Sequence, residues 1–371
     1  MSKAMGKGIA RPTVAVIGGG YGGSAVAKAL DEDTDVVLID PKDAFVHAAG
    51  SLRALVKPDW ADNIFFPYDT LLQRGRFVRD RAASVDAAGV TLGSGERVDA
   101  DYLVLATGSG YPFPAKPDTD TAEVALERLR ATHAELGEAG RVLLVGAGPV
   151  GLELAGEIKA VWPEKEVTLV DPAEELVPGF APEMRADLTR QLAELGVEVR
   201  LGTSLTGEPP TGPGQAKTFT VATSGGPLTA DIWFRCYGVR INGEPLEGEL
   251  AAVRTPKGQV RVTEELNVEG YEHIYAVGDL TDLAEAKMAG YAMQHAEVVA
   301  KNILARVRGE RPEAVYRPSP VPAVLLPLGP TGGVGQFPSP EGPNVLPARM
   351  VAEYKGADLF TGRFAELFGT A

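Results

Sequence analysis

The feature that most constrains this chain is a pattern that occurs twice. It consists of a short apolar stretch, a glycine-rich turn, a helical stretch, and a second apolar stretch that ends in an aspartate. The first copy covers residues 13–40 and the second covers residues 141–171, about 130 residues further along the chain. A repeat of this kind is much harder to obtain by accident than a single motif. Each copy predicts a βαβ unit, and therefore a parallel sheet whose faces are covered.

In the first copy, Gly18, Gly20 and Gly23 have the spacing of a dinucleotide-binding turn. The first glycine permits the tight turn, the second lets a pyrophosphate approach the backbone, and the third lets the helix pack closely. The helix then offers unpaired N–H groups to the phosphates. Asp40 follows about 20 residues later, where a carboxylate accepts ribose hydroxyls. The turn comprises Gly18, Gly19, Gly20, Tyr21, Gly22 and Gly23.

The second copy has the same design, with Gly146, Gly148 and Gly151 in the turn and Asp171 at the end of the next strand. An acid at that position hydrogen-bonds a ribose 2′-hydroxyl and repels a 2′-phosphate. The second turn therefore predicts a nicotinamide dinucleotide site that favours NADH over NADPH. Two dinucleotide units in one chain indicate hydride transfer from nicotinamide C4 to flavin N5.

These patterns predict an α/β fold with two Rossmann-like dinucleotide-binding domains and a small C-terminal α+β cap. The predicted FAD domain is discontinuous, covering residues 1–114 and 263–312, with the NAD(H) domain inserted at residues 115–262. The cap is expected at residues 313–371. Long helices are predicted from Lys287 to about Val307 and from Ala357 to Phe368.

Composition narrows the possible partners. A chain of 371 residues is long enough for two or three domains, and 44% apolar with 23% charged residues is typical of globular proteins. The formal net charge of −14 argues against a nucleic-acid partner.

No apolar run approaches the roughly 20 residues that a transmembrane helix needs. Residues 1–12 lack the apolar core of a signal peptide, and Ser2 stands where N-myristoylation requires glycine. We therefore expect a cytoplasmic monomer or homodimer.

The chain has a single cysteine, Cys236, within an apolar stretch. It therefore has neither an internal disulfide nor a Cys-x-x-Cys redox pair. The dithiol chemistry of disulfide reductases and the paired-cysteine route of sulfide:quinone reductases are both excluded. The four histidines show no metal-ligand spacing, so no metal site is predicted.

Two further segments carry a resemblance to known flavoproteins. Ala106-Thr107-Gly108 follows a predicted strand, and residues 275–279 end in Gly278-Asp279. These segments resemble the second and third flavin motifs of the two-dinucleotide-binding-domain flavoproteins. The resemblance implies that Thr107, Gly108, Gly278 and Asp279 belong to the flavin site and that the Asp279 carboxylate hydrogen-bonds the ribityl chain. It also assigns FAD to the first glycine turn and NADH to the second.

A finer resemblance covers nearly the whole chain, from about Thr13 to Phe368. The segments that carry it are residues 45–47, 51–54, 157–159, 162–169, 287–289, 326–330, 332–336 and 355–360. In these segments the chain is similar to the apoptosis-inducing-factor-like, mitochondrion-associated (ferroptosis-suppressor type) family of FAD-dependent NAD(P)H:quinone oxidoreductases. The resemblance implies that Arg53 touches FAD and that Ala83 lies in the loop that meets the adenine.

Glu153 and Glu157 lie four residues apart on the predicted helix after the second turn, so they share one face and a nearby cation would stabilise them. In the family that the chain resembles, the corresponding Glu and Lys lie near the flavin and nicotinamide rings. We therefore expect Lys287 to pair with Glu157 beside the flavin, as the catalytic residues, while Glu153 positions the nicotinamide.

The resemblance implies a quinone as the small-molecule electron acceptor. The chain departs from the family at the N-terminus, where no lipidation site is found. Whether the protein makes peripheral contact with a membrane is therefore left open. Three alternatives also stay open: a ferredoxin-reductase-type enzyme with a protein acceptor, a non-enzymatic FAD/NADH redox sensor, and a tailoring enzyme with an unusual acceptor.

Overall fold

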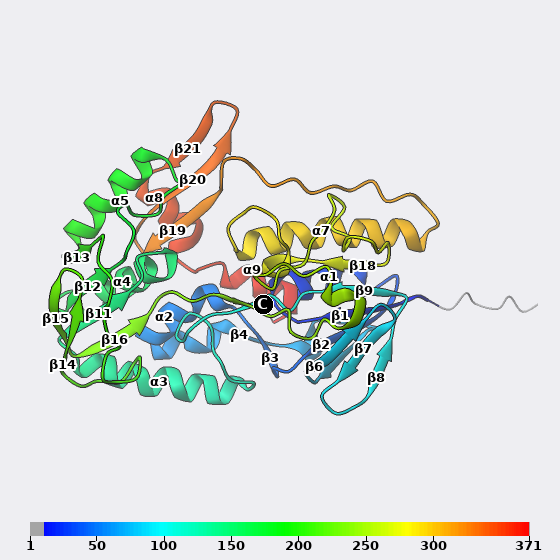
Figure 1. Cartoon of the computed structure of the whole chain (residues 1–371), viewed down its shortest axis with the longest axis horizontal. Helices are drawn as coiled ribbons and strands as arrows, with labels where there is room; N and C mark the ends of the chain where they lie inside the picture. The colour runs from blue at the N-terminus through cyan, green and yellow to red at the C-terminus, as the bar shows by residue number, and fades with distance from the viewer. Residues whose placement is uncertain (1–10, 371) are drawn as a thin grey trace, which may run out of the picture. The chain divides into compact units, whose positions relative to one another are not determined.

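The computed structural model describes residues 11–370 (Figure 1). These residues form two compact units. The first unit contains the described residues up to Asp43, together with Pro67–Ser109 and Ile241–Pro318. The second contains Ala44–Phe66, Gly110–Arg240 and the described residues from Ser319 onwards. The expectations about residues 1–10, including Ser2, lie outside the described part of the chain.

The main sheet of the first unit consists of β1 (Thr13–Ile17), β2 (Asp35–Asp40), β5 (Arg76–Arg79), β9 (Tyr102–Leu105) and β18 (Ile274–Ala276). All neighbouring strands are parallel, in the order β18-β9-β1-β2-β5. The register places Ile17 between Ile39 and Leu105, and all three are buried. Their continuous apolar sequences suit strands that are covered on both faces.

The two faces of this sheet are covered by different elements. Alternate residues such as Ile17 and Ile39 pack against Val90 of a smaller antiparallel sheet. On the other side, α1 (Tyr21–Leu30) packs against α7 (Ala289–Val307) (Figure 1). The smaller sheet is formed by β6 (Ala82–Asp86), β7 (Gly89–Leu92) and β8 (Arg97–Asp99).

The second unit contains the other parallel sheet, formed by β11 (Arg141–Val145), β12 (Glu166–Val170), β13 (Val197–Arg200) and β16 (Ile232–Arg235). Its strand order is β13-β12-β11-β16. The antiparallel hairpin of β14 (Phe219–Thr223) and β15 (Gly226–Ala230) packs on it through Val221 and Trp233. The helices of this part are α3 (Ala122–Glu138), α4 (Pro149–Val161) and α5 (Pro182–Glu194).

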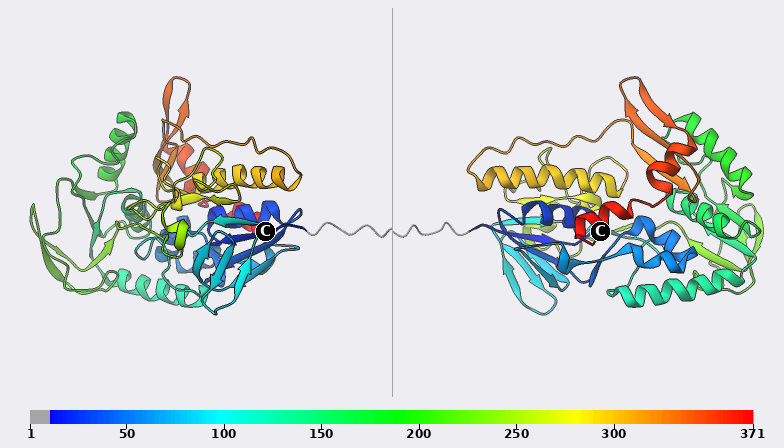
Figure 2. Two further views of the ribbon diagram at one scale, coloured as in Figure 1. Left: turned by 45° about the vertical axis from the view of Figure 1, so that its right-hand side comes forward. Right: turned by 180° about the vertical axis from the view of Figure 1, so that it is seen from behind.

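The C-terminal part of the second unit is an antiparallel sheet followed by helices (Figure 2). Phe364 and Phe368 of the final helix pack against Phe45 and Phe66. The strands are β19 (Val324–Leu328), β20 (Gly332–Ser339) and β21 (Gly342–Leu346), and the helices are α8 (Ala348–Val351), η5 (Ala352–Gly356) and α9 (Thr361–Phe368). The short helices α2 (Ser51–Val56) and η2 (Pro58–Ile64) belong to the same unit.

The predicted α/β fold with two strand–turn–helix units is confirmed, and the predicted domain boundaries stay a prediction. Residues 241–262 belong to the first unit because Val85 exchanges backbone hydrogen bonds with Pro245 and Glu247, and Val260 joins the core of that unit. The described residues from Ser319 onwards group with the second unit, where β19 packs on α4 and β20 packs on α5.

The two long predicted helices begin later than expected. The helix predicted from Lys287 begins at Ala289. The helix predicted from Ala357 begins at Thr361, because Leu359 and Phe360 adopt left-handed backbone angles, with φ of 57° and 64°, that interrupt a right-handed helix. No helix among residues 11–370 combines the length and apolar character that a bilayer span requires.

Candidate functional site

The first glycine turn joins β1 to α1 in a conformation that only glycine tolerates. Gly18 has φ of 106°, its N–H donates to the Ile39 carbonyl at 2.8 Å, and a Cβ there would lie 2.3 Å from the Ala106 oxygen. A Cβ on Gly23 would lie 1.8 Å from the Gly18 oxygen. Glycine at these two positions therefore lets the turn close tightly between strand and helix.

The second glycine turn repeats this geometry between β11 and α4. Gly146 has φ of 109°, and its N–H donates to the Val170 carbonyl at 2.8 Å. A Cβ on Gly151 would lie 2.0 Å from the Gly146 oxygen. The internal repeat that the sequence predicts is thus a repeat of backbone conformation as well as of residue order.

The aspartates at the two strand ends also have equivalent contacts. Asp40 accepts from the N–H groups of Gly19 and Lys42, both at 2.8 Å. Asp171 accepts from Ala147 at 2.7 Å and from Ala173 at 2.8 Å. Each carboxylate therefore fixes its own glycine turn. Its oxygens have further lone pairs, and the predicted contact of each with a ribose remains a prediction.

Both turns leave room where a dinucleotide phosphate would bind. Gly20 and Gly148 are the N-cap residues of α1 and α4, and a Cβ on either would meet no described atom within 4 Å. Neither helix has a side-chain cap or an acidic residue in its first turn. The N-cap position of each helix therefore has room for a ligand and no capping side chain, which fits a pyrophosphate.

The two segments predicted to contact flavin lie together within the first unit. Ser109 donates a short hydrogen bond from its hydroxyl to the Asp279 carboxylate. Asn242 holds the preceding turn, since its amide donates to the Thr107 carbonyl at 3.0 Å and its own carbonyl accepts from the Thr107 hydroxyl. Sequence reasoning missed Ser109 and Asn242; the position of Ser109 directly after Thr107-Gly108 is the only signal for it.

A buried histidine supports the Gly278-Asp279 turn. The His295 Nδ1 accepts from the Gly278 N–H at 3.0 Å, and its Nε2 lies 2.8 Å from Glu285. Tyr316 donates to the same carboxylate at 2.6 Å. Because Nδ1 is an acceptor, the imidazole is held as the tautomer that carries its proton on Nε2.

Lys287 follows this turn and is half-buried. Its Nζ donates to the carbonyl of Thr281 at 2.8 Å and to that of Leu283 at 3.4 Å. Burial lowers the pKa of its ammonium, although the nearby carboxylates, of which Asp279 acts most strongly, oppose this shift. The ammonium therefore lies in the same acidic surroundings as the Gly278-Asp279 turn.

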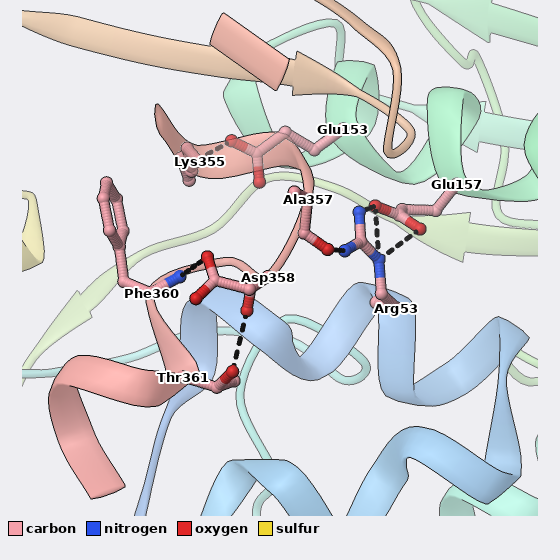
Figure 3. Close-up of polar contacts among 8 residues, drawn as sticks. All are labelled: Arg53, Glu153, Glu157, Lys355, Ala357, Asp358, Phe360 and Thr361. Atoms are coloured by element: carbon pink, nitrogen blue, oxygen red, sulfur yellow. Dashed lines mark hydrogen bonds and ion pairs between the residues drawn. The ribbon is translucent and has the colours of Figure 1, made fainter. Parts of the chain in front are cut away.

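A cluster of charged residues forms in the second unit, where α2, α4 and the C-terminal segment meet (Figure 3). Arg53 of α2 makes a two-pronged ion pair with Glu157 of α4, with Nη2–Oε1 and Nε–Oε2 distances of 2.7 and 3.1 Å. Both side chains are only 3% exposed. The remaining arm of the guanidinium donates to the Ala357 carbonyl at 2.9 Å.

The second pair of this cluster is formed by Glu153 and Lys355 (Figure 3). The Lys355 Nζ lies 2.8 Å from the Glu153 carboxylate and also donates to the Leu325 carbonyl at 3.0 Å. Burial raises the pKa of the Glu153 carboxyl, and Lys355 counteracts this shift. Sequence reasoning missed Lys355 as a site residue, although residues 355–360 are among the segments that carry the family resemblance.

The cation that neutralises Glu157 is therefore Arg53, and the expected partner Lys287 belongs to the first unit. The sequence misassigned this pair because helical spacing shows that a cation is needed but not which one folds next to it. Arg53 was predicted to touch FAD, which stays a prediction. Ala83 is exposed and lies in β6 at an irregularity of the strand register, not in a loop.

The single cysteine is buried, as expected, and burial raises the pKa of the Cys236 thiol to about 12. It is therefore protonated and shielded near neutral pH. Among residues 11–370, no three His, Cys, Asp or Glu side chains are grouped in a way that would hold a metal ion.

Comparison with known sequences identifies the family. The model of the family described as pyridine nucleotide-disulphide oxidoreductase matches residues 12–300. The ferroptosis suppressor protein 1 of Taeniopygia guttata is 34% identical over 330 residues, which cover 87% of this chain and 88% of that protein. The apoptosis-inducing factor homolog B of Dictyostelium discoideum is 31% identical over 87% of this chain and 89% of its own length.

Solved structures share the fold. The sulfide:quinone oxidoreductase of Aquifex aeolicus superposes with a TM-score of 0.76 at 21% identity, over 97% of this chain and 92% of that one. The NDH2 of Plasmodium falciparum, solved in complex with NADH, has a TM-score of 0.71 at 13% identity, over 97% and 99% of the two chains. The chain therefore belongs to the pyridine nucleotide-disulphide oxidoreductase family and is an FAD-dependent NAD(P)H oxidoreductase, with two dinucleotide turns and no cysteine pair.

Proposed function

We propose that this protein takes a hydride from NADH, in preference to NADPH, and delivers the electrons to a quinone-like acceptor without a cysteine relay. The observation that carries the proposal is the pair of matching glycine turns, each with an aspartate bonded to its backbone. FAD, when bound, supplies the two-electron chemistry that links nicotinamide to acceptor. The chain binds and orients the nucleotides, and its buried Cys236 takes no electrons.

The proposed preference for NADH rests on Asp171. Two backbone N–H groups hold its carboxylate at the end of β12, next to the second turn. A fixed negative charge at that strand end hydrogen-bonds a 2′-hydroxyl and repels a 2′-phosphate.

Replacing Asp171 with serine tests this preference. We expect the ratio of kcat/KM for NADH to kcat/KM for NADPH to fall at least about tenfold, because the repulsion of the 2′-phosphate is lost. Glu166→Gln is the matched control, since it removes a charge from the opposite, exposed end of the same strand. An unchanged ratio in Asp171→Ser would contradict the proposed preference.

The charged residues have proposed roles at the rings. We assign Lys287 to the flavin, because it is half-buried and follows the Gly278-Asp279 turn within the same unit. Glu153 is assigned to the nicotinamide, and its ion pair with Lys355 keeps the carboxylate oriented. Arg53 and Glu157 fix α2 against α4 next to Glu153. We expect Lys287→Ala to slow the reduction of bound FAD by NADH, and an unchanged rate would remove this assignment.

The quinone acceptor is supported by the resemblance to ferroptosis suppressor protein 1 and by the name of the sulfide:quinone oxidoreductase that shares the fold. The lone cysteine separates this chain from enzymes that use a dithiol. A cytoplasmic location and a monomeric or homodimeric state complete the proposal. Cell fractionation and light scattering are the direct tests of these two points.

The proposal is tested by anaerobic reduction with NADH, followed by mixing with separate acceptors. We expect NADH to bleach the flavin absorbance and a soluble ubiquinone analogue to restore it within the turnover time. Reoxidation by an iron–sulfur protein alone would favour the ferredoxin-reductase alternative. Slow reoxidation by every acceptor, with dimerisation on NADH binding, would favour the redox sensor. Failure of NADH to bleach the flavin would exclude hydride transfer altogether.

A further inference from the structure

Within residues 11–370, side-chain hydroxyls bond the first glycine turn but not the second. The Gly19 carbonyl accepts from the Tyr68 hydroxyl at 2.9 Å and from the Ser24 hydroxyl at 2.7 Å. The Gly19 N–H donates to Asp40 at 2.8 Å. Tyr68 is 2% exposed and Ser24 is fully buried, so both bonds are shielded from water. Both polar groups of Gly19 are therefore fixed by the protein.

We propose that Tyr68 and Ser24 are positioning residues that lock the first glycine turn for a resident, slowly exchanging dinucleotide. The second turn lacks this lock and suits a nucleotide that binds and leaves in every cycle. This inference rests on the proposed function, which assigns FAD to the first turn and NADH to the second.

The residues that differ between the two turns explain why a tyrosine hydroxyl can bond the first turn. A Cβ on Gly19 would lie 2.4 Å from the Tyr68 hydroxyl oxygen, so a larger residue there would displace the ring. The corresponding residue of the second turn is Ala147, which carries such a Cβ. Five residues after Ala147, where the first turn has Ser24, the second has Leu152. Among residues 11–370, no side chain donates a hydrogen bond to the Ala147 carbonyl.

Tyr68 is itself held in place along α1. The segment that begins with η3 (Tyr68–Thr70) receives a bond from the Lys28 ammonium to the Leu71 carbonyl, at 2.6 Å. The buried Asp31 carboxylate, at the end of α1, accepts from the N–H groups of Gln73 and Gly75, both at 2.6 Å. The Tyr68 ring also stacks on Phe77, with 4.4 Å between ring centres. The hydroxyl is therefore presented to Gly19 by a segment fixed at several points.

The planarity of the peptide bond explains how this lock reaches the ligand. The Gly19 carbonyl and the Gly20 N–H belong to one trans peptide group and point in opposite directions. Pinning the carbonyl onto Tyr68 and Ser24 therefore turns the Gly20 N–H away from the protein. Gly20 caps α1, and a Cβ added to it would have no described atom within 4 Å. The donor is thus oriented toward the phosphate before the nucleotide arrives, which lowers the entropy lost on binding.

The test compares Tyr68→Phe, Ser24→Ala and the double variant, all as full chains. FAD affinity is measured by titrating deflavinated protein, and FAD release is followed by the recovery of flavin fluorescence after dilution. Each single change removes one neutral hydrogen bond, so we expect FAD to bind about fivefold more weakly, and about thirtyfold more weakly in the double variant. KM for NADH, measured on the FAD-saturated enzyme, is expected to stay within about twofold.

Tyr271→Phe is the matched control, because it removes the hydroxyl of a half-buried tyrosine of the same unit, which makes a solvent-exposed bond to Glu249. We expect it to leave FAD affinity unchanged. Tyr68→Phe keeps the ring that stacks on Phe77, and circular dichroism of the deflavinated protein checks that the variants fold.

Three outcomes would overturn the inference. They are wild-type FAD affinity in the double variant, a rise of KM for NADH that parallels the loss of FAD affinity, or release of FAD from the wild type as fast as NADH. Failure of the proposed function is read separately, as the inability of NADH to reduce the FAD-saturated wild type. If that reduction proceeds while the double variant retains FAD normally, only the positioning role is lost.

Discussion

At the residue scale, the pair of Arg53 and Glu157 is the most tightly buried charge interaction of the second unit. Both side chains are 3% exposed, and the guanidinium also bonds the Ala357 carbonyl and lies over the Trp60 ring. Burying two charges is expensive, so such a pair is stable only while every arm is satisfied. Removing one partner of the pair should therefore change the free energy of unfolding more than removing both.

Arg53→Met should lower the free energy of unfolding by about 3–5 kcal/mol, because the Glu157 carboxylate stays buried without its partner. Arg53→Met combined with Glu157→Leu should recover most of that loss. Arg97→Met, which breaks an ion pair with the exposed Asp86, should lose less than about 1 kcal/mol. Urea unfolding of the wild type and the three variants measures these free energies. Equal losses in the single and double variants at residues 53 and 157 would contradict this account.

His47 is a second buried polar residue whose protonation should be visible in stability. Its Nε2 lies 2.6 Å from the Leu359 carbonyl, and its ring packs on Phe364. Burial, helped by the charge of Lys355, lowers the pKa of the imidazole from 6.5 to about 4, against the opposing effects of the Leu359 carbonyl and Asp358. The folded protein therefore keeps this histidine neutral at pH values where the unfolded chain protonates it.

This difference predicts a loss of stability on acidification. Between about pH 6.5 and pH 4 the unfolded state binds more protons at His47, so the free energy of unfolding falls as the pH falls. Across that window the loss approaches about 3 kcal/mol, and above pH 6.5 this group contributes no pH dependence. Urea unfolding at a series of pH values measures the slope. His47→Gln should make it shallower, and an identical slope in that variant would contradict the prediction.

At the scale of elements, α4 and β19 approach until their backbones nearly touch. A Cβ on Gly156 would lie 2.5 Å from the Leu328 Cα and 2.6 Å from the Gly329 nitrogen. These are backbone atoms, which cannot rotate away as a side chain can. This contact is one reason why the C-terminal strands group with the second unit.

Gly156→Ala should therefore lower the free energy of unfolding by about 1–3 kcal/mol, since α4 and β19 must move apart to admit the methyl group. Gly137→Ala is the matched control within α3, where a Cβ would meet no described atom. There we expect a gain of about 0.5–1 kcal/mol, because alanine favours the helix. Thermal unfolding of both variants decides the matter, and a neutral Gly156→Ala would show that the contact is loose.

Two buried lysines hold helix ends in the same unit. Lys165 donates to the carbonyls of Gly137 and Ala139 at the end of α3, and it lies beside the Trp162 ring. Lys159, at the end of α4, donates to the carbonyls of Pro163 and Lys165. The Gly137 carbonyl belongs to the last turn of α3, where carbonyls lack partners within the helix, and the other three carbonyls lie beyond the helix ends. The segment 162–169, which carries part of the family resemblance, thus has a structural role.

At the scale of the whole molecule, the charge of −14 opposes the approach of an anionic nucleotide. Raising the ionic strength from about 0.01 to 0.15 M shortens the Debye length from about 30 to 8 Å and screens this repulsion. We expect the second-order rate of flavin reduction by NADH to increase over that range. The rate of reoxidation by a neutral quinone should stay constant. Stopped-flow measurements of the two half-reactions test this, and a falling NADH rate would indicate a local basic patch that outweighs the net charge.

Sequence alone predicted the features that depend on close neighbours along the chain. The positive φ of Gly18 and Gly146, the strands before them and the aspartates after them all belong to short segments. Helix starts were less accurate, as at Thr361, because the left-handed Leu359 and Phe360 have no glycine-like signal.

Only the tertiary structure decided which distant residues meet. Glu157 pairs with Arg53, 104 positions away along the chain, where Lys287 was expected. Glu153 pairs with Lys355, which is 202 positions away. Tyr68 meets Gly19 across 49 positions, through a segment that no motif marks. A glycine turn is fixed by the backbone sterics of a few adjacent residues, so its sequence is sufficient to predict it. A charged group or a hydroxyl can pair with many different residues, and the packing of the folded chain decides which of them lies next to it.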